Sequence, residues 1–292
     1  MGEDNRSMIS LLNSIGFLVF GLTITGCSHL FYFPDSYLYR HPADFTGEYF
    51  EAKIESSPEA LLTAWLFPAK TKPVRGVVIQ FHGNGQNMSA HGIFATWLVE
   101  HGYHVVTFDY RCYGASTGTP SQEGTIKDGD AIMRYVNNHP DLSYLPKIVL
   151  GQSLGGAIAL TTLAHYNHKV DVLVLDSSFG SYQEVARSVL ANHWPTWPFQ
   201  WLSYLLVEEF QEPLVEAKGY KGIGSYLVVF SEHDPVVPYS NSQEIIHTLG
   251  QGDLVVWSTG GDHHIGAFAP SSPYRTELVR FLCDRLSFSG CG

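Results

Sequence analysis

Residues 147–156 read K-I-V-L-G-Q-S-L-G-G, and this stretch decides the fold that the sequence predicts. An apolar, β-branched run, typical of a buried strand, ends directly in G-Q-S-L-G at residues 151–155. Small apolar residues then continue to position 165 at helical spacing. A side chain at Gly151 or Gly155 would collide with neighbouring backbone, so such a turn needs glycine on both sides of its serine. The pattern predicts a strand, a sharp turn with Ser153 at its tip, and a helix packed closely on the sheet.

Ser153 is a candidate nucleophile because a serine on such a turn projects its hydroxyl outward, towards a helix N-terminus that favours negative charge. An isolated match to G-x-S-x-G carries little weight in a chain with 28 glycines. The strand before the motif and the helix after it are the context that supports the assignment.

Length and composition predict one globular domain and exclude some functions. The chain has 292 residues, of which 45% are hydrophobic and 15% charged, and this fits one α/β domain with a small additional segment. The net charge of −11 and the lack of a basic stripe argue against nucleic-acid binding. The spacing of cysteines and histidines does not resemble a zinc site. The sequence implies neither a metal nor an organic cofactor.

The N-terminal residues are expected to lie outside the domain. Residues 8–27 form an apolar run that ends in small residues and Cys27, as in a secretion signal. The I-T-G-C at residues 24–27 resembles the bacterial lipobox, in which the cysteine receives diacylglycerol and cleavage occurs just before it. An uncleaved membrane anchor is the alternative, although the run is short for a spanning helix of about 20 residues. We predict a lipoprotein signal peptide at residues 1–26 and lipidation of Cys27 in a bacterial cell envelope, facing the periplasm or the exterior.

Two further expectations follow for the ends of the mature chain. Residues 27–49 form a lead-in whose aromatic run, residues 30–34, either packs on the domain, which we favour, or lies near the lipid surface. Cys283 and Cys291 are close enough in sequence to form a disulfide in an oxidising compartment.

Strands and helices alternate over most of the chain, which predicts a mostly parallel sheet with helices on both faces. Residues 50–54 and 61–67 are expected to begin the sheet as an antiparallel pair. Further strands are expected at residues 76–81, 104–109, 170–175, 225–230 and 254–257, and helices at residues 93–101 and 123–138. About residues 181–222, rich in aromatics and proline, form a helical insert that either acts as a lid over a substrate tail or packs on the core.

Three loops supply the remaining candidate site residues. H-G-N-G at residues 82–85 is expected to provide a backbone N–H donor for an oxyanion from Asn84, with Leu154 providing the second donor. A simple strand–helix turn is the alternative there, and His82 is expected to fix the loop. Asp234 follows the strand at residues 225–230, and His263 follows the last strand.

Ser, Asp and His thus occur in the chain order expected for residues that meet at the carboxyl edge of such a sheet. Asp176 competes for the role of the acid, although the turn-and-proline sequence around Asp234 favours Asp234. His264 competes for the role of the base, and the G-x-x-H spacing from Gly260 selects His263.

Over about residues 50–286 these features resemble the α/β-hydrolase superfamily. More narrowly, F-D-Y-R-C-Y-G-A-S at residues 108–116, H-G-N at residues 82–84 and residues 231–238 are similar to Bem46-type serine hydrolases. Cys112 stands where that group usually has glycine. The resemblance implies an α/β-hydrolase domain over residues 50–292 with a small helical lid.

The resemblance also implies roles for the site residues: Ser153 as nucleophile, Asp234 as acid, His263 as base, and Leu154 and Asn84 as the oxyanion hole. The implied activity is cleavage of carboxylic esters through an acyl-enzyme. The aromatic insert and the membrane tether suggest that these esters are medium-chain or lipid-derived. Three alternatives stay open: a serine peptidase, a thioesterase or acyltransferase of the same fold, and a lipoprotein that uses the site only for binding.

Overall fold

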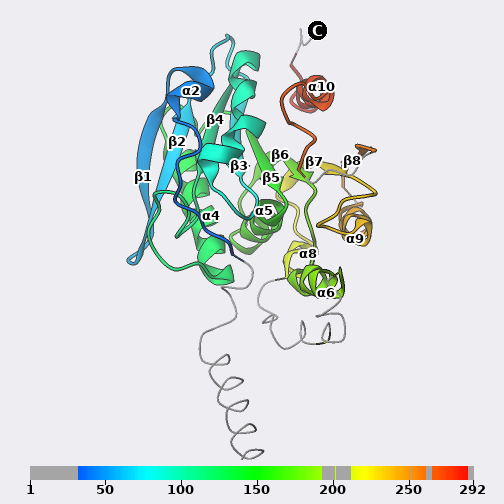
Figure 1. The fold of residues 1–292 in the computed structure, drawn as a ribbon. Coiled ribbons are helices and arrows are strands. Elements are labelled where there is room, and N and C mark those ends of the chain that lie inside the picture. The colour runs from blue at the N-terminus through cyan, green and yellow to red at the C-terminus, as the bar shows by residue number, and fades with distance from the viewer. Residues whose placement is uncertain (1–31, 193–200, 202–211, 251, 261–264, 289–292) are drawn as a thin grey trace, which may run out of the picture.

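An eight-stranded sheet in the order β1-β2-β4-β3-β5-β6-β7-β8 forms the centre of the molecule (Figure 1). The computed structural model describes residues 32–192, 201, 212–250, 252–260 and 265–288. The strands are β1 (Phe50–Ser57), β2 (Ala60–Phe67), β3 (Gly76–Phe81), β4 (Tyr103–Phe108), β5 (Lys147–Gln152), β6 (Val170–Asp176), β7 (Ile223–Phe230) and β8 (Leu254–Ser258). β2 pairs antiparallel with β1 and β4, and all other pairs are parallel. The predicted α/β class and antiparallel start are confirmed.

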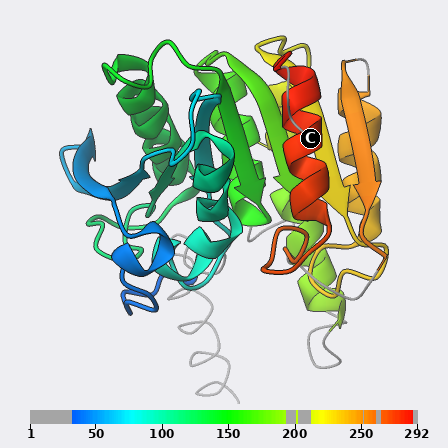
Figure 2. The same cartoon turned by 90° about the horizontal axis from the view of Figure 1, so that it is seen from above.

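Helices cover both faces of this sheet (Figure 2). They are α2 (Ala43–Thr46), α3 (Met88–His91), α4 (Gln122–Asn138), α5 (Leu154–His165), α6 (Tyr182–Asn192), α8 (Pro213–Ala217), α9 (Tyr239–Leu249), α10 (Tyr274–Arg285) and the 3₁₀ helices η2 (Gly92–Phe94) and η3 (Thr96–His101). The core on one face packs α4, α5, α6, α8 and α9 against the sheet, and the core on the other packs η3 and α10.

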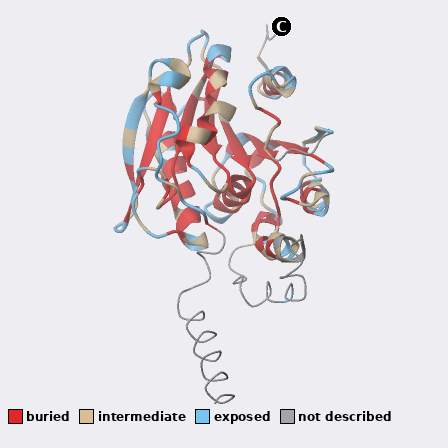
Figure 3. Cartoon of the chain, viewed as in Figure 1, coloured by how far each residue is buried: buried red, intermediate tan, exposed pale blue. Residues whose placement is uncertain are grey.

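The central strands are apolar throughout because both of their faces are covered. In β3, Val77 and Ile79 face the larger core and Val78 faces the other. Residues 154–163 of α5 are all buried, and Figure 3 shows α5 and the strands beside it in the colour of buried residues. Helix α5 therefore lies within the core that covers one face of the sheet.

The single helix predicted at residues 93–101 is wrong, because this segment forms two short 3₁₀ helices. The chain forms α3 earlier, where the Asn87 side chain caps Ser89 N, and then continues as η2 and η3. An ideal Cβ on Gly92 would lie 3.0 Å from the Phe45 ring, so this backbone packs directly on α2. Apolar spacing in a short segment does not distinguish a 3₁₀ turn from an α-helical one, and the tertiary contact decides.

Several predictions fall on residues outside the described ones, among them the signal peptide at residues 1–26 and the lipidation of Cys27. Of the predicted insert at residues 181–222, the structure describes α6, Trp201 and residues 212–222, with α8 packed against α5. Cys283 is disulfide-bonded, and its predicted partner Cys291 lies outside the described residues. Within the described residues, no helix has the length and apolar character needed to cross a membrane.

Candidate active site

Ser153 occupies the sharp turn between β5 and α5, in the local structure that its sequence predicts. Its backbone has φ 50° and ψ −119°, a strained conformation for a residue with a side chain. An ideal Cβ on Gly151 would lie 2.5 Å from Gly156 Cα, and one on Gly155 would lie 2.1 Å from Phe81 O. Both glycines are therefore required by close backbone contacts, and these contacts hold Ser153 in place.

Buried polar groups support this turn from beneath. Ser153 N donates to Asp176 O at 2.9 Å, and Ser178 Oγ donates to Ser153 O at 3.1 Å. Gln80 Nε2 donates to Gln152 Oε1 at 2.9 Å, and Gln152 Nε2 lies 3.4 Å from Asp176 Oδ2. Asp176, the competitor for the acid, is thus buried under the turn as part of its support. The roles of Gln80 and Gln152 were not predicted from the sequence. The only signal is that each is a buried polar residue in a mainly apolar strand.

The loop after β3 lies against the serine turn. An ideal Cβ on Gly83 would be 3.5 Å from Gln152 O and 3.7 Å from Ile265 Cδ1, so three loops meet at this glycine. Leu154 is the first residue of α5, where a backbone N–H has no acceptor within the helix. The structure therefore brings the start of α5, with Leu154, next to the loop after β3 that carries Asn84.

The Asn84 side chain holds this loop in a way that the sequence did not reveal. Its Oδ1 accepts hydrogen bonds from Phe33 N at 3.0 Å, Gly85 N at 2.9 Å and Tyr113 Oη at 2.8 Å. The donors come from the lead-in, the loop itself and the loop after β4. Asn84 is thus a junction of three segments as well as the predicted source of an N–H donor.

His82 and Asp109 are buried directly behind the same loop. His82 Nδ1 lies 2.8 Å from Gly83 O, and Nε2 lies 3.5 Å from Asp109 Oδ1. Asp109 Oδ1 also accepts a hydrogen bond from Met88 N at 2.7 Å, at the start of α3. These contacts agree with the prediction that His82 fixes the loop, and they add Asp109 as its partner.

The loop that follows β4 is held by a buried ion pair. Arg111 Nη2 donates to Asp128 Oδ1 at 2.8 Å, and Arg111 N donates to Asp128 Oδ2 at 2.8 Å. Ser56 Oγ donates to the same carboxylate at 2.6 Å, and the Asp128 side chain is 0% exposed. Because Tyr113 in this loop bonds Asn84, the ion pair also supports the candidate oxyanion loop.

Asp234 follows β7, as predicted. Its Oδ1 accepts hydrogen bonds from Val236 N at 2.8 Å and Val237 N at 2.9 Å, which orient the half-buried carboxylate. The loop after β7 lies at the same carboxyl edge of the sheet as the Ser153 turn, with β6 between the two strands.

His263 and His264 both lie outside the described residues. The chain resumes at Ile265, which has φ 49° and donates its N–H to Ser177 Oγ at 3.3 Å. Ser177 directly follows Asp176, whose carbonyl binds Ser153 N. Ile265, the first described residue after the predicted base, therefore lies beside the support of the serine turn and the Gly83 loop.

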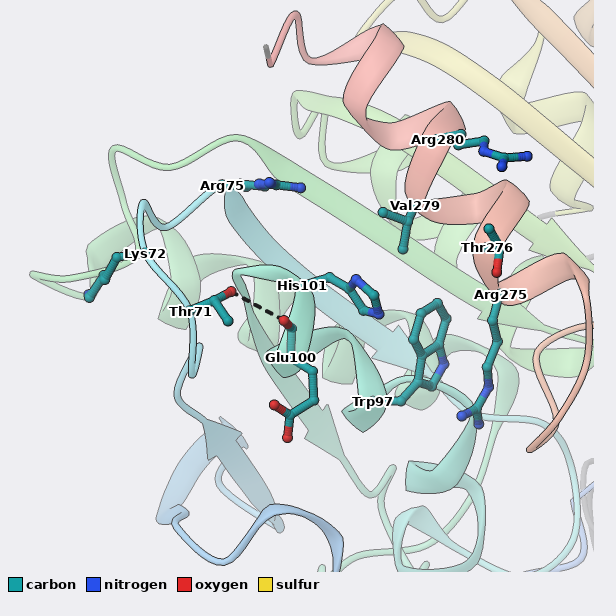
Figure 4. Close-up of a pocket in the computed structure, with 10 residues that line it drawn as sticks. All are labelled: Thr71, Lys72, Arg75, Trp97, Glu100, His101, Arg275, Thr276, Val279 and Arg280. Atoms are coloured by element: carbon teal, nitrogen blue, oxygen red, sulfur yellow. Dashed lines mark hydrogen bonds between the residues drawn. The ribbon is translucent and has the colours of Figure 1, made fainter. Parts of the chain in front are cut away.

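A separate pocket of about 560 Å³ lies between η3 and α10 (Figure 4). Arg275 stacks over the Trp97 ring at 4.8 Å and donates to Phe268 O and Ile93 O at 2.9 and 2.8 Å. It thereby joins the segment that follows the predicted base to the segment that follows α3. The lining of this pocket includes none of the predicted site residues.

In the part of the chain that the structure describes, no group of three or more His, Cys, Asp or Glu side chains could hold a metal.

Replacing Asn84 with alanine is expected to lower kcat about tenfold to hundredfold with little change in KM, because the backbone donor stays while its position loosens. Three hydrogen-bond donors lose their acceptor in this variant. Steady-state hydrolysis of a dissolved ester measures the effect. Asn84→Asp keeps an acceptor oxygen and should retain more activity, and Asn137→Ala, at an exposed amide, should be unchanged. Parental kcat in Asn84→Ala would contradict the role of the side chain.

Several known proteins are similar to this chain in sequence. A family model described as serine aminopeptidase, S33, matches residues 72–218, about half of the chain, and one described as TAP-like protein matches residues 206–285. The chain is 31% identical over 278 residues to the uncharacterized protein YfhR of Salmonella typhi, covering 88% of each chain. It is 29% identical over 150 residues to the protein bem46 of Schizosaccharomyces pombe, covering 51% of this chain and 50% of that one.

Solved structures share the fold. The esterase Pf2001 of Pyrococcus furiosus has a TM-score of 0.68 at 21% identity, covering 86% of this chain and 96% of its own. Est1E of Butyrivibrio proteoclasticus, solved with ferulic acid, has a TM-score of 0.61 at 15% identity, covering 81% and 99%. The chain belongs to the α/β-hydrolase superfamily. Within that superfamily it is a Bem46-like hydrolase, in agreement with the resemblance seen in its sequence.

Proposed function

We propose that this hydrolase is a serine esterase that cleaves carboxylic esters through an acyl-enzyme. The observation that carries the proposal is the strained turn at Ser153, which lies against the glycine-bearing loop after β3. A binding protein has no use for a serine held in a strained turn beside two candidate oxyanion donors.

The proposed reaction has two steps. Ser153 Oγ attacks the acyl carbon while His263 takes its proton, and the N–H groups of Leu154 and Asn84 stabilise the oxyanion. The intermediate collapses, His263 returns the proton to the leaving alcohol, and the acyl group stays on Ser153. Water, deprotonated by the same histidine, then attacks the acyl-enzyme. As the bond from the acyl carbon to Ser153 Oγ breaks, His263 returns the proton to Oγ, and the acid is released. Asp234 orients His263 and stabilises its charged form.

For the substrate, we propose medium-chain or lipid-derived esters, hydrolysed at a membrane of the bacterial envelope to which Cys27 anchors the chain. The aromatic composition of residues 193–201 supports an apolar acyl site, and the apolar run that ends at Cys27 supports the location. No cofactor enters the proposed reaction. Aminopeptidase activity is the second candidate, because the matching family model bears that description.

The test uses the full chain in mild detergent, with p-nitrophenyl esters of increasing acyl length and a panel of amino-acid p-nitroanilides. We expect faster turnover of esters than of anilides, together with a fluorophosphonate adduct on the peptide that contains Ser153. Faster turnover of anilides would replace the esterase with an aminopeptidase, and acyl transfer to an added alcohol in preference to water would indicate an acyltransferase. Neither turnover nor labelling would leave the chain a binding protein.

A further inference from the structure

Residues 32–39 form what we call the N-terminal strap, whose backbone is bound by the loops beside the candidate active site. Phe33 N donates to Asn84 Oδ1 at 3.0 Å, and Tyr39 N donates to Ser89 Oγ at 2.9 Å. Asn87 Nδ2 donates to Asp35 O at 2.9 Å and to Tyr37 O at 2.8 Å. The strap is therefore held along its length by the segment between β3 and α3.

The first described residue of the strap anchors it in the core. Tyr32 is only 4% exposed, and its hydroxyl lies 3.3 Å from Thr125 Oγ1 in α4. Burial raises the pKa of Tyr32 to about 12, so this phenol stays neutral at physiological pH. Of the described part of the aromatic run at residues 30–34, Tyr32 packs on the domain as expected, whereas Phe33 and Pro34 are exposed.

The side chains that follow point away from the domain. Phe33 is 63% exposed, Tyr37 67%, Leu38 54% and Tyr39 42%, and we call these four side chains the aromatic patch. The Tyr37 and Tyr39 rings meet edge to face at 5.0 Å, and Tyr39 Oη donates to the Asp35 carboxylate. The bound backbone thus presents large apolar side chains to the outside in a preorganised arrangement. The ring contact joins Tyr37 to Tyr39, and Phe33 and Leu38 are exposed on the same short segment. Several large exposed apolar side chains on one segment indicate an interaction surface.

A lipid surface is the partner that fits this patch. Tyrosine and other amphipathic aromatic side chains favour the boundary between lipid and water. The strap begins five residues after Cys27, and a fully extended chain of that length spans at most about 18 Å. A lipid on Cys27 would therefore hold Tyr32, at the start of the strap, within that distance of the membrane.

We propose that the aromatic patch rests on the lipid surface and so directs the candidate active site towards esters in the membrane. This inference rests on the proposed anchoring and esterase function. The hydrogen bond from Phe33 N to Asn84 Oδ1 connects the strap to the candidate oxyanion loop. The proposed contact of the patch with lipid is therefore linked to that loop.

The first test locates the patch without measuring activity. The full chain carrying Leu38→Trp is reconstituted into phosphatidylcholine vesicles with brominated or ordinary acyl chains. Tyr144→Trp is the matched control, because Tyr144 is 74% exposed in the loop before β5, at the amino edge of the sheet. We expect brominated lipid to quench the tryptophan added at position 38 and not the one added at 144. Equal quenching at both positions, or none at 38, overturns the proposal. A lack of quenching at 38 with a doubled mass in detergent would assign the patch to a second copy of the chain.

The second test compares two substrates. A variant that combines Tyr37→Ser and Leu38→Ser is expected to hydrolyse an ester held in vesicles about tenfold more slowly, because it loses apolar contact with the lipid. Its rate on a dissolved short-chain ester should equal that of Tyr144→Ser, since these side chains make no bond to the candidate site. Equal rates on the vesicle ester would contradict the proposal. If neither parent nor variant cleaves a dissolved ester, the proposed function fails, while quenching still decides where the patch lies.

Discussion

The Ser153→Ala variant is expected to lose ester hydrolysis by a factor of about 10⁴ or more in kcat/KM, because no other group in the proposed reaction forms the acyl-enzyme. The fold should survive, since Ser153 is bound to Asp176 and Ser178 through its backbone N and O, which alanine keeps. Initial rates on a p-nitrophenyl ester and urea unfolding of the same preparations measure the two effects. Fluorophosphonate labelling should disappear in parallel.

Three controls separate chemistry from structure. Ser143→Ala removes an exposed serine before β5 and should keep parental activity. His263→Ala should lose about as much activity as Ser153→Ala, whereas His264→Ala should stay active, because a single imidazole accepts the serine proton. Near-parental turnover by Ser153→Ala would rule out the proposed mechanism. Loss of activity in His264→Ala but not in His263→Ala would identify His264 as the base.

Asp128→Ala is expected to lower the free energy of unfolding by about 3–5 kcal/mol, the usual effect of removing one partner of a buried ion pair. The variant leaves the Arg111 guanidinium, whose side chain is 10% exposed, without its carboxylate. It also releases Arg111 N and Ser56 Oγ from the same oxygens. Urea unfolding followed by circular dichroism measures the change.

Glu123→Ala is the matched control for this prediction, because Glu123 forms an exposed ion pair with Lys127 on the same helix. We expect that variant to change stability by less than about 0.5 kcal/mol. Adding Arg111→Met to Asp128→Ala should restore part of the loss, since it removes the unpaired charge. If Asp128→Ala lowers the free energy of unfolding no more than Glu123→Ala does, the buried ion pair does not stabilise the fold.

Most strands were predictable from sequence because each is a short apolar run between turn residues. β3, β5 and β6 follow the pattern of strands buried on both faces. The prediction failed at residues 93–101, where the contact of Gly92 with Phe45 accompanies two 3₁₀ turns in place of one helix. That contact joins positions 47 residues apart, so it cannot be predicted from the local sequence pattern.

For the candidate site, the sequence by itself determined the strand, turn and helix at Ser153, because the crowding that requires Gly151 arises within ten consecutive residues. It also placed Asn84 and Asp234 after the ends of strands. Only the tertiary structure decided that Asn84 joins three segments and that the strap lies beside it. The physical reason is that hydrogen bonds such as Phe33 N to Asn84 Oδ1 join positions 51 apart, and they form only once the sheet has brought its carboxyl ends to one edge.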